Sequence, residues 1–231
     1  MHPSATQNIQ LFYQTYYLAS VQAQPRILEI GSLDVNGSLR QHAPAQARYC
    51  GADFSHGPGV DLVLSDAYAL PLETDSFDFI VTSSCFEHAQ FFWVTFLEVA
   101  RVLRPGGLFY LNAPSSGGYH CYPVDCWRFY PDAGVALQNW ARKQGLDITL
   151  LESFVHHGGD WQDFVGVFFK GGASLQPPSA RMLDSKTDFE NGLLPLQSQN
   201  KINLQEFTQD QRRINGLQQA LGAQEANCKG Q

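Results

Sequence analysis

The stretch FDFIVTSSCFEHAQFFWVTFLEVARVLRPGGLFYLNAP, residues 77–114, decides the fold class of this chain. Phe77–Ser83 is an apolar run of strand length, and Phe91–Leu103 has an apolar stripe at helical spacing that ends at Pro-Gly-Gly. Leu108–Pro114 is a second apolar strand, closed by proline. A strand, a helix and a strand in this order predict a crossover unit whose two strands lie parallel.

The same alternation continues on both sides of this unit. The further expected elements are helices over Asn8–Ser20, Val35–His42 and Pro131–Lys143, and strands over Arg26–Ile30, Ala47–Asp53, Val60–Leu64, Asp147–Val155 and Asp163–Lys170. The turn between the last two strands is too short for a helical crossover, so these strands should pair antiparallel. The pattern predicts an α/β fold with a doubly wound, mostly parallel sheet.

Composition indicates one sizeable globular domain. The chain has 231 residues, 44% hydrophobic and 16% charged, which suffices for a real core. We place this domain at residues 1–170. Residues 171–231 are rich in glutamine, glycine and proline, and we expect a weakly ordered or helical C-terminal tail there. The net charge of −7 argues against a general nucleic-acid binder.

The expected cellular location rests on the absence of two kinds of segment from the sequence, a membrane span and a signal peptide. No stretch approaches the ~20 apolar residues that span a bilayer. The first ten residues, MHPSATQNIQ, lack the charged and apolar regions of a signal peptide. Five scattered cysteines suggest free thiols rather than disulfides. We therefore expect a cytoplasmic protein with neither a membrane nor a nucleic-acid partner; the oligomeric state is not predicted.

Polar residues follow successive strands at the edge where open α/β sheets bind ligands. The stretch EIGSLDVNG, residues 29–37, follows the first strand, and Gly31 permits a sharp turn there. It is not a G-x-G-x-x-G dinucleotide fingerprint. Asp53 and Asp66 end the next two strands, where carboxylates can accept hydrogen bonds from ribose hydroxyls and an adenine amino group. Each alone also fits a turn former or a helix cap; their successive positions favour the nucleoside interpretation.

The ordered blocks ILEIGS, YCGADF, SDAYALPLETDSFDFIVTSSCFEH and EVARVLRPGGLFYLNAPS resemble class I S-adenosylmethionine-dependent methyltransferases of the small-molecule, type 11-like branch. The resemblance covers about residues 8–170 and implies S-adenosylmethionine as cofactor. It also implies a Rossmann-like sheet of seven strands with the last one antiparallel. The implied cofactor-binding residues are Glu29, Gly31, Ser32, Asp53, Phe54, Asp66, Ala67 and Ser83. One departure is Leu33, where the common pattern has a second glycine.

Candidate catalytic residues are His88, His120 and Asp125. Methyl transfer from a sulfonium is an in-line displacement, and aligning the reactants contributes up to ~7–11 kcal/mol. An oxygen acceptor also benefits from a general base, typically ~10²–10⁴-fold. His88 fits a catalytic role and a helix-capping or supporting role equally well. His156 and His157 fit a solvated turn better than an acceptor pocket.

The block HCYPVDCWRFYP, residues 120–131, follows the fifth strand at the ligand-binding rim. His120, Cys121 and Cys126 could offer three metal ligands, but the two cysteines lack C-x-x-C spacing and a second pair, so we expect no metal site. The block resembles a recurrent one in a methyltransferase subgroup associated with sugar, polysaccharide or natural-product modification. Its aromatic residues either cap the core or contact an acceptor. Asp125 and Arg128 either line the acceptor pocket or form a salt bridge that holds the loop.

These observations predict methyl transfer from S-adenosylmethionine to a small-molecule acceptor. The expected acceptor is a hydroxyl of a sugar or polysaccharide precursor, or of a secondary metabolite. One alternative is a non-catalytic, methyltransferase-like binding or scaffold protein. A second alternative is a nicotinamide-dependent oxidoreductase, which the missing glycine fingerprint and the RVLRPGG block disfavour.

Overall fold

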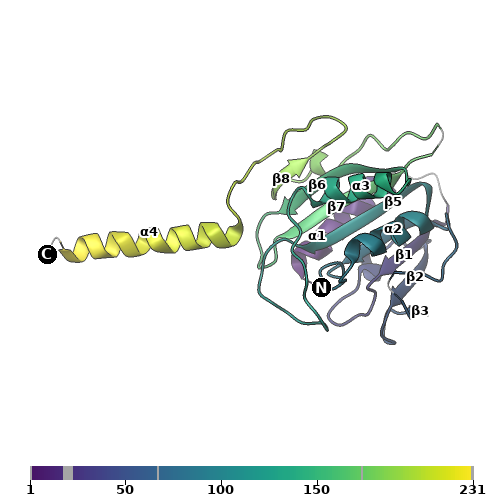
Figure 1. Ribbon diagram of the computed structural model, residues 1–231, viewed down its shortest axis with the longest axis horizontal. Helices are drawn as coiled ribbons and strands as arrows, with labels where there is room; N and C mark the ends of the chain where they lie inside the picture. Colours follow the sequence, from purple (N-terminus) through teal and green to yellow (C-terminus); the bar gives the residue numbers. More distant parts are fainter. Residues whose placement is uncertain (1, 18–22, 67, 173, 230–231) are drawn as a thin grey trace.

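A computed structural model of the chain describes residues 2–17, 23–66, 68–172 and 174–229. Within these ranges, eight strands form one sheet in the order β3-β2-β1-β4-β5-β7-β6-β8 (Figure 1). The strands are β1 (Arg26–Ile30), β2 (Arg48–Asp53), β3 (Leu62–Val63), β4 (Phe77–Ser83), β5 (Leu103–Pro114), β6 (Ile148–His156), β7 (Asp163–Lys170) and β8 (Phe189–Leu193). The helices are α1 (Pro3–Phe12), α2 (Phe92–Val102), α3 (Ala133–Lys143) and α4 (Gln209–Lys229).

Strand directions confirm the doubly wound, mostly parallel, Rossmann-like sheet. Strands β3, β2, β1, β4 and β5 are parallel neighbours. Strand β7 inserts between β5 and β6 and is antiparallel to both, as the short turn before it requires. Strand β8 adds an eighth, antiparallel member beside β6. The sheet therefore continues past residue 170, into a segment whose composition does not suggest a strand.

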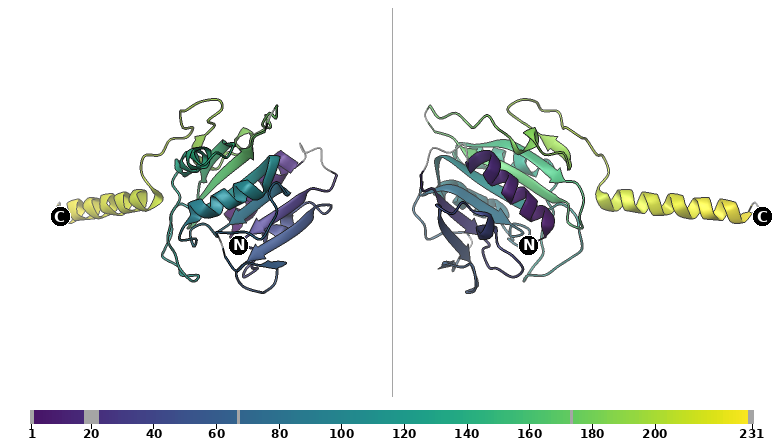
Figure 2. Two further views of the ribbon diagram at one scale, coloured as in Figure 1. Left: turned by 45° about the vertical axis from the view of Figure 1, so that its right-hand side comes forward. Right: turned by 180° about the vertical axis from the view of Figure 1, so that it is seen from behind.

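Helices cover both faces of the sheet (Figures 1 and 2). Helices α2 and α3 lie on one face, where Phe96 and Leu137 join a core with Leu28 and Ile80 of the sheet. Helix α1 lies on the other face, seen from behind in Figure 2, and packs with the alternate residues of the same strands. Successive side chains of a strand point to opposite faces, which explains why the central strands are apolar throughout.

Local structure departs from the expected elements at several places, and the strand expected over Val60–Leu64 is reduced to the two residues of β3. Helix α1 begins at Pro3 and ends at Phe12, a π-helical turn continues to Tyr17, and the last expected helical residues lie outside the described ones. The helix expected over Val35–His42 is reduced to a 3-10 turn at Leu39–His42. Helix α2 passes directly into β5, so that Pro-Gly-Gly lies within the first part of the strand.

The C-terminal segment divides into a packed part and a projecting part. A 3-10 turn at Met182–Asp184 and strand β8 pack against the domain, and Met182 is fully buried. Helix α4 extends away from the domain (Figure 1). Its apolar residues Ile214, Leu217 and Leu221 are exposed. Among the described helices, none has the length and apolar character needed to cross a bilayer.

Candidate functional site

The strand order reverses between β1 and β4. In an open α/β sheet, a crevice forms at this position, at the carboxyl ends of the two strands. From β1 the chain proceeds outward to β2 and β3, then returns to the other side of β1 as β4. Ligands of open α/β sheets bind at such a switch point, outside the carboxyl ends of the strands. Gly31, after β1, meets Cys85, after β4: a Cβ on Gly31 would lie 2.7 Å from Cβ of Cys85. Gly31 also has φ +79°, a conformation that favours glycine.

The loop after β1 lies on the end of β2. The backbone N–H groups of Gly31 and Ser32 both donate to the carbonyl of Ala52, at 2.9 and 3.2 Å. The Leu33 N–H donates to Oδ2 of Asp53 at 3.0 Å. Leu33 itself fills space that Gly57 leaves free, because a Cβ on Gly57 would lie 2.5 Å from Cδ1 of Leu33. The departure from the common glycine pattern is thus matched by a glycine in the facing loop.

The two predicted nucleoside-binding carboxylates differ in how they are held. Asp53 is half-buried, and each of its oxygens accepts one backbone N–H: Oδ2 from Leu33 and Oδ1 from Ser55, both at 3.0 Å. Asp66 is exposed and accepts the Tyr68 N–H at 2.7 Å. A carboxylate oxygen has two lone pairs, so Asp53 keeps an acceptor site on each oxygen. Phe54, beside it, is 56% exposed.

The other residues of the predicted cofactor set have different surroundings. Glu29 is buried on the α1 side of the sheet, accepts the Tyr49 hydroxyl at 2.8 Å, and burial raises its pKa to about 7. Ser32 is also buried, and no described residue hydrogen-bonds its hydroxyl. Ser83, at the end of β4, accepts a hydrogen bond from the Asn112 side chain at 3.3 Å. Ala67 lies outside the described residues.

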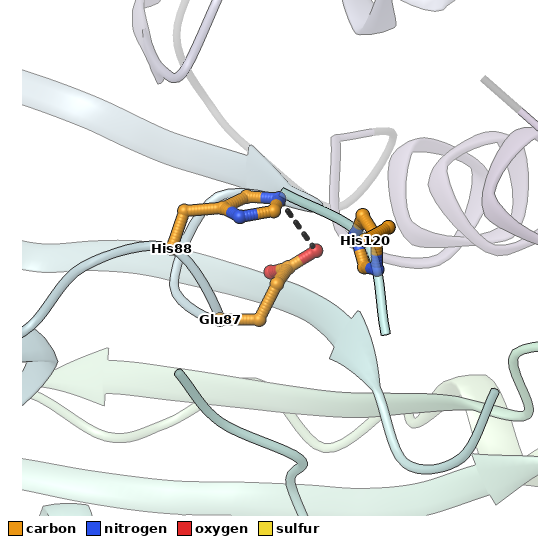
Figure 3. A group of neighbouring side chains, drawn as sticks. All are labelled: Glu87, His88 and His120. Carbon is orange, nitrogen blue, oxygen red and sulfur yellow. Dashed lines mark ion pairs between the residues drawn. The ribbon is translucent and has the colours of Figure 1, made fainter. Parts of the chain in front are cut away.

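A cluster of two histidines and a glutamate lies beyond the end of β4 (Figure 3). Glu87 is 1% exposed, and burial raises its pKa to about 8. His88 donates from Nδ1 to the carbonyl of Val124, and its Nε2 lies 3.6 Å from Oε1 of Glu87. Burial lowers the pKa of His88. His120 comes from the loop after β5, with its ring centroid 5.0 Å from that of His88. The structure thus brings His88 and His120 together, and Asp125 lies beside His120, with its Oδ2 3.2 Å from Nδ1 of that ring.

Asp125 braces the loop that carries His120. Arg128 donates to both Asp125 oxygens, at 2.6 and 2.8 Å, and the His120 N–H donates to Oδ2 at 2.8 Å. The Asp125 side chain is only 2% exposed. Hydrogen bonds from Arg128 hold the pKa of this carboxyl well below its usual range. Of the two roles considered for Asp125 and Arg128, the geometry displays the salt bridge. A carboxylate of such low pKa is a poor general base near neutral pH.

The rest of the 120–131 block is fastened to the segment after β4. The N–H groups of Cys126 and Trp127 both donate to the carbonyl of Glu87, at 2.8 and 3.2 Å. Phe129 is buried against Phe92 with ring centroids 4.9 Å apart, whereas Tyr122 and Tyr130 are 60% and 56% exposed. The aromatic residues therefore divide between the two expected roles: some extend the core and others face outward.

A cavity lies beside the carboxyl end of β5, next to the same block. It is lined from the domain by Ser115, Ser116 and Gln162, and from the C-terminal segment by residues 204–208. The Ser116 hydroxyl lies 3.2 Å from the Gln209 side-chain oxygen, which ties the start of α4 to this rim. The C-terminal segment therefore forms one wall of this cavity.

The histidine pair at the end of β6 lies in a different network, and the expected solvated turn is wrong for His156, which is the last residue of the strand. His156 is buried, 3.2 Å from the Asn8 side chain and 3.1 Å from Nζ of Lys186. His157 is largely exposed and pairs with Glu190 of β8. Both residues stabilise the contact between the C-terminal segment and the sheet.

Residues 17–111 match the family model described as "Methyltransferase domain". The match covers less than half of the chain. Two curated relatives are similar to this chain over part of its length. "Probable phthiotriol/phenolphthiotriol dimycocerosates methyltransferase 2" of Mycobacterium ulcerans (strain Agy99) is 42% identical over 66 residues, 29% of this chain and 25% of that protein. "Phthiotriol/phenolphthiotriol dimycocerosates methyltransferase" of Mycobacterium leprae (strain TN) is 32% identical over 115 residues, 43% of this chain and 41% of that protein.

The chain spans about a quarter to two fifths of the length of these relatives. Among solved structures, the fold is similar to that of Burkholderia thailandensis 1,6-didemethyltoxoflavin-N1-methyltransferase, solved with bound 1,6-didemethyltoxoflavin and S-adenosylhomocysteine. The TM-score is 0.56 at 15% identity, covering 74% of this chain and 79% of that chain. This likeness confirms the predicted Rossmann-like architecture.

The match to the methyltransferase domain ends at Leu111, before the 120–131 block and the C-terminal segment. Sequence reasoning named His88, inside the matched residues, and His120, outside them, but missed Glu87. A signal for Glu87 was present: strands β4 and β5 are parallel neighbours, so the loops that follow them meet at one edge. An acidic residue next to His88 in the loop after β4 is therefore expected to lie near a histidine in the loop after β5.

Proposed function

We propose that this chain transfers a methyl group from S-adenosylmethionine to a small-molecule acceptor. One observation carries the proposal: within a chain matching the methyltransferase domain, the crevice between β1 and β4 is flanked by Gly31 and by the carboxylate of Asp53 on the next strand. This is the position at which doubly wound sheets bind nucleotide-like ligands.

The residues around this crevice fit a nucleoside cofactor. Asp53 retains one free acceptor site on each oxygen, which suits two neighbouring ribose hydroxyls. The exposed ring of Phe54 offers an apolar face to a base. Ser32 has a buried hydroxyl without a partner among the described residues, a polar group available beneath the loop. The cofactor, when bound, supplies an activated methyl group on a sulfonium.

The expected acceptor is a hydroxyl of a sugar or polysaccharide precursor, or of a secondary metabolite. Supporting this, the loops after β4 and β5 combine polar groups, His88 and His120, with exposed aromatic rings in the 120–131 block, Tyr122 and Tyr130. Aromatic faces and hydrogen-bonding groups together suit hydroxyl-bearing molecules. The two curated relatives are named for phthiotriol and phenolphthiotriol dimycocerosates, so lipid alcohols belong in the acceptor panel.

Calorimetric titration of the full chain tests the cofactor assignment. We expect binding of S-adenosylmethionine and S-adenosylhomocysteine and none of NAD. The Asp53→Ala variant should weaken both affinities at least tenfold, while Asp210→Ala, an exposed aspartate on α4, should leave them unchanged. Binding of NAD alone would favour an oxidoreductase, and binding of none of the three would favour a scaffold protein; either result refutes the proposal.

A further inference from the structure

Glu87, His88 and His120 present three potential metal ligands to one point (Figure 3). One ring nitrogen of each histidine and a carboxylate oxygen of Glu87 all lie within 4.8 Å of one another. The residues come from two loops: Glu87 and His88 follow β4, and His120 follows β5. Their convergence is therefore a product of the fold rather than of local sequence spacing.

The histidine rings are held as metal-binding imidazoles usually are. Nδ1 of His88 donates to the carbonyl of Val124, which leaves the lone pair on Nε2, the nitrogen facing Glu87. Nδ1 of His120 lies 3.3 Å from the carbonyl of Gly118 and 3.2 Å from Oδ2 of Asp125. A carbonyl or carboxylate on one ring nitrogen fixes the tautomer, orients the ring and makes the other nitrogen a better ligand.

Glu87 lacks a hydrogen-bond partner for one carboxylate oxygen. Its Oε2 is buried, and no donor in the described part of the chain reaches it. A buried carboxylate is costly unless it is paired or coordinates a metal ion. The other oxygen, Oε1, lies 3.6 Å from Nε2 of His88, a nitrogen that carries a lone pair in the tautomer described above, so this contact brings two acceptors together. A cation at this point would satisfy both groups.

We propose that Glu87, His88 and His120 form a binding site for one divalent transition-metal ion, with Zn²⁺ as the best-suited ion. Two imidazoles and one carboxylate are a ligand set typical of zinc sites that keep a position open for an oxygen ligand. Ligand atoms about 2.0–2.1 Å from a tetrahedral ion lie roughly 3.3 Å apart. The Glu87–His88 pair, at 3.6 Å, is close to this spacing. His120 lies on a loop and its side chain is 34% exposed, so this side chain can move toward the ion and shorten its distances to the other two ligands.

This ligand set differs from the one considered from the sequence alone. That set was His120, Cys121 and Cys126, and both cysteines are exposed thiols. Cys121 makes its hydrogen bond outward, to the hydroxyl of Tyr119 at 2.8 Å. His120 is common to both ligand sets, so replacing the two cysteines distinguishes the site with Glu87 and His88 from a site with Cys121 and Cys126.

Metal binding is measured without methyl donor or acceptor, so its failure would leave the proposed methyl transfer standing. Chelator-treated full-length protein is titrated with Zn²⁺ by calorimetry and with Co²⁺ by visible absorption, and Mg²⁺ serves as a hard-ion comparison. We expect one Zn²⁺ per chain, Co²⁺ bands of a four- or five-coordinate site, and no Mg²⁺ binding.

Variants assign the ligands. Glu87→Gln, His88→Ala and His120→Ala should each weaken Zn²⁺ binding at least tenfold. The matched control His56→Ala, an exposed histidine between β2 and β3, should change it less than twofold, as should the double variant C121S/C126S. If Glu87→Gln unfolds, His120→Ala decides, because its side chain lies on a partly exposed loop. Wild-type Zn²⁺ affinity in His120→Ala, loss of binding in C121S/C126S, or Mg²⁺ as the only ion bound would overturn the proposal.

Discussion

Replacing Asp125 with alanine should release the 120–131 block while leaving the domain folded. The substitution removes the acceptor of three hydrogen bonds, two from Arg128 and one from the backbone N–H of His120. It leaves the Arg128 side chain, which is 21% exposed, to be solvated by water. The domain core contains neither residue, so the effect should be local.

The magnitude follows from the number and kind of bonds. A hydrogen bond to a charged group contributes about 1.5–3 kcal/mol, and removing one partner of a buried pair costs more than the pair itself contributes. Because Arg128 recovers hydration when the pair is broken, we take about 3 kcal/mol for the local opening free energy of the block. Each 1.4 kcal/mol is a factor of ten, so the block should open roughly 100-fold more often.

Amide hydrogen exchange, followed by mass spectrometry, measures this opening directly. The reporting amides are those of Cys126 and Trp127, which donate to the carbonyl of Glu87. Arg128→Ala and the double variant complete a thermodynamic cycle, and we expect a coupling of about 2 kcal/mol between the two side chains. Asp132→Ala, at an aspartate whose side chain is 73% exposed, is the control. Exchange in Asp125→Ala within twofold of wild type would refute the bracing role.

Three further predictions concern other parts of the chain. Burial raises the pKa of Glu29 from 4.5 to about 7, so folding should lose ~3 kcal/mol as pH rises from about 4.5 to 7, and Glu29→Gln should flatten this slope in urea titrations. Gly57→Ala should displace Leu33 and weaken S-adenosylhomocysteine binding about tenfold, with recovery in Gly57→Ala/Leu33→Ala; unchanged affinity in the single variant would show the contact to be dispensable. Removing residues 214–231 should change the unfolding free energy by less than about 0.5 kcal/mol, because Ile214, Leu217 and Leu221 are exposed; a larger loss would show that α4 packs on the domain.

The sheet was predictable where the apolar pattern is strong. Strands β4 and β5 are continuous apolar runs, and α2 between them has a clear helical stripe, so their order and direction follow from the residues alone. Strand β8 was missed because its sequence, FENGL, has only two apolar residues and lies in a Gln-rich segment. Its stability comes from pairing with β6, a tertiary contact that no local pattern records.

The candidate site was predictable to the level of strand ends and no further. Asp53 and Gly31 were placed by their positions after β2 and β1. Glu29 shows why strand position alone does not place a side chain. Successive side chains of a strand alternate between faces, so Glu29 lies opposite Ile30, in the α1-side core, although it is only two residues before Gly31. The expected helix over Val35–His42 failed for a local reason, because the Asp34 side chain accepts the Gly37 N–H at 2.7 Å and closes a turn instead.

Asp125 connects the stability of the block to the geometry of the histidines. Its Oδ2 accepts the His120 N–H and lies 3.2 Å from Nδ1 of the same residue, so one carboxylate fixes both the backbone and the ring of His120. The block is in turn fastened to the carbonyl of Glu87, the residue whose side chain faces that ring. The contacts that hold the block closed therefore also set the distance between His120 and Glu87. This coupling explains why a histidine, an aspartate and an arginine occur together in one short segment after β5.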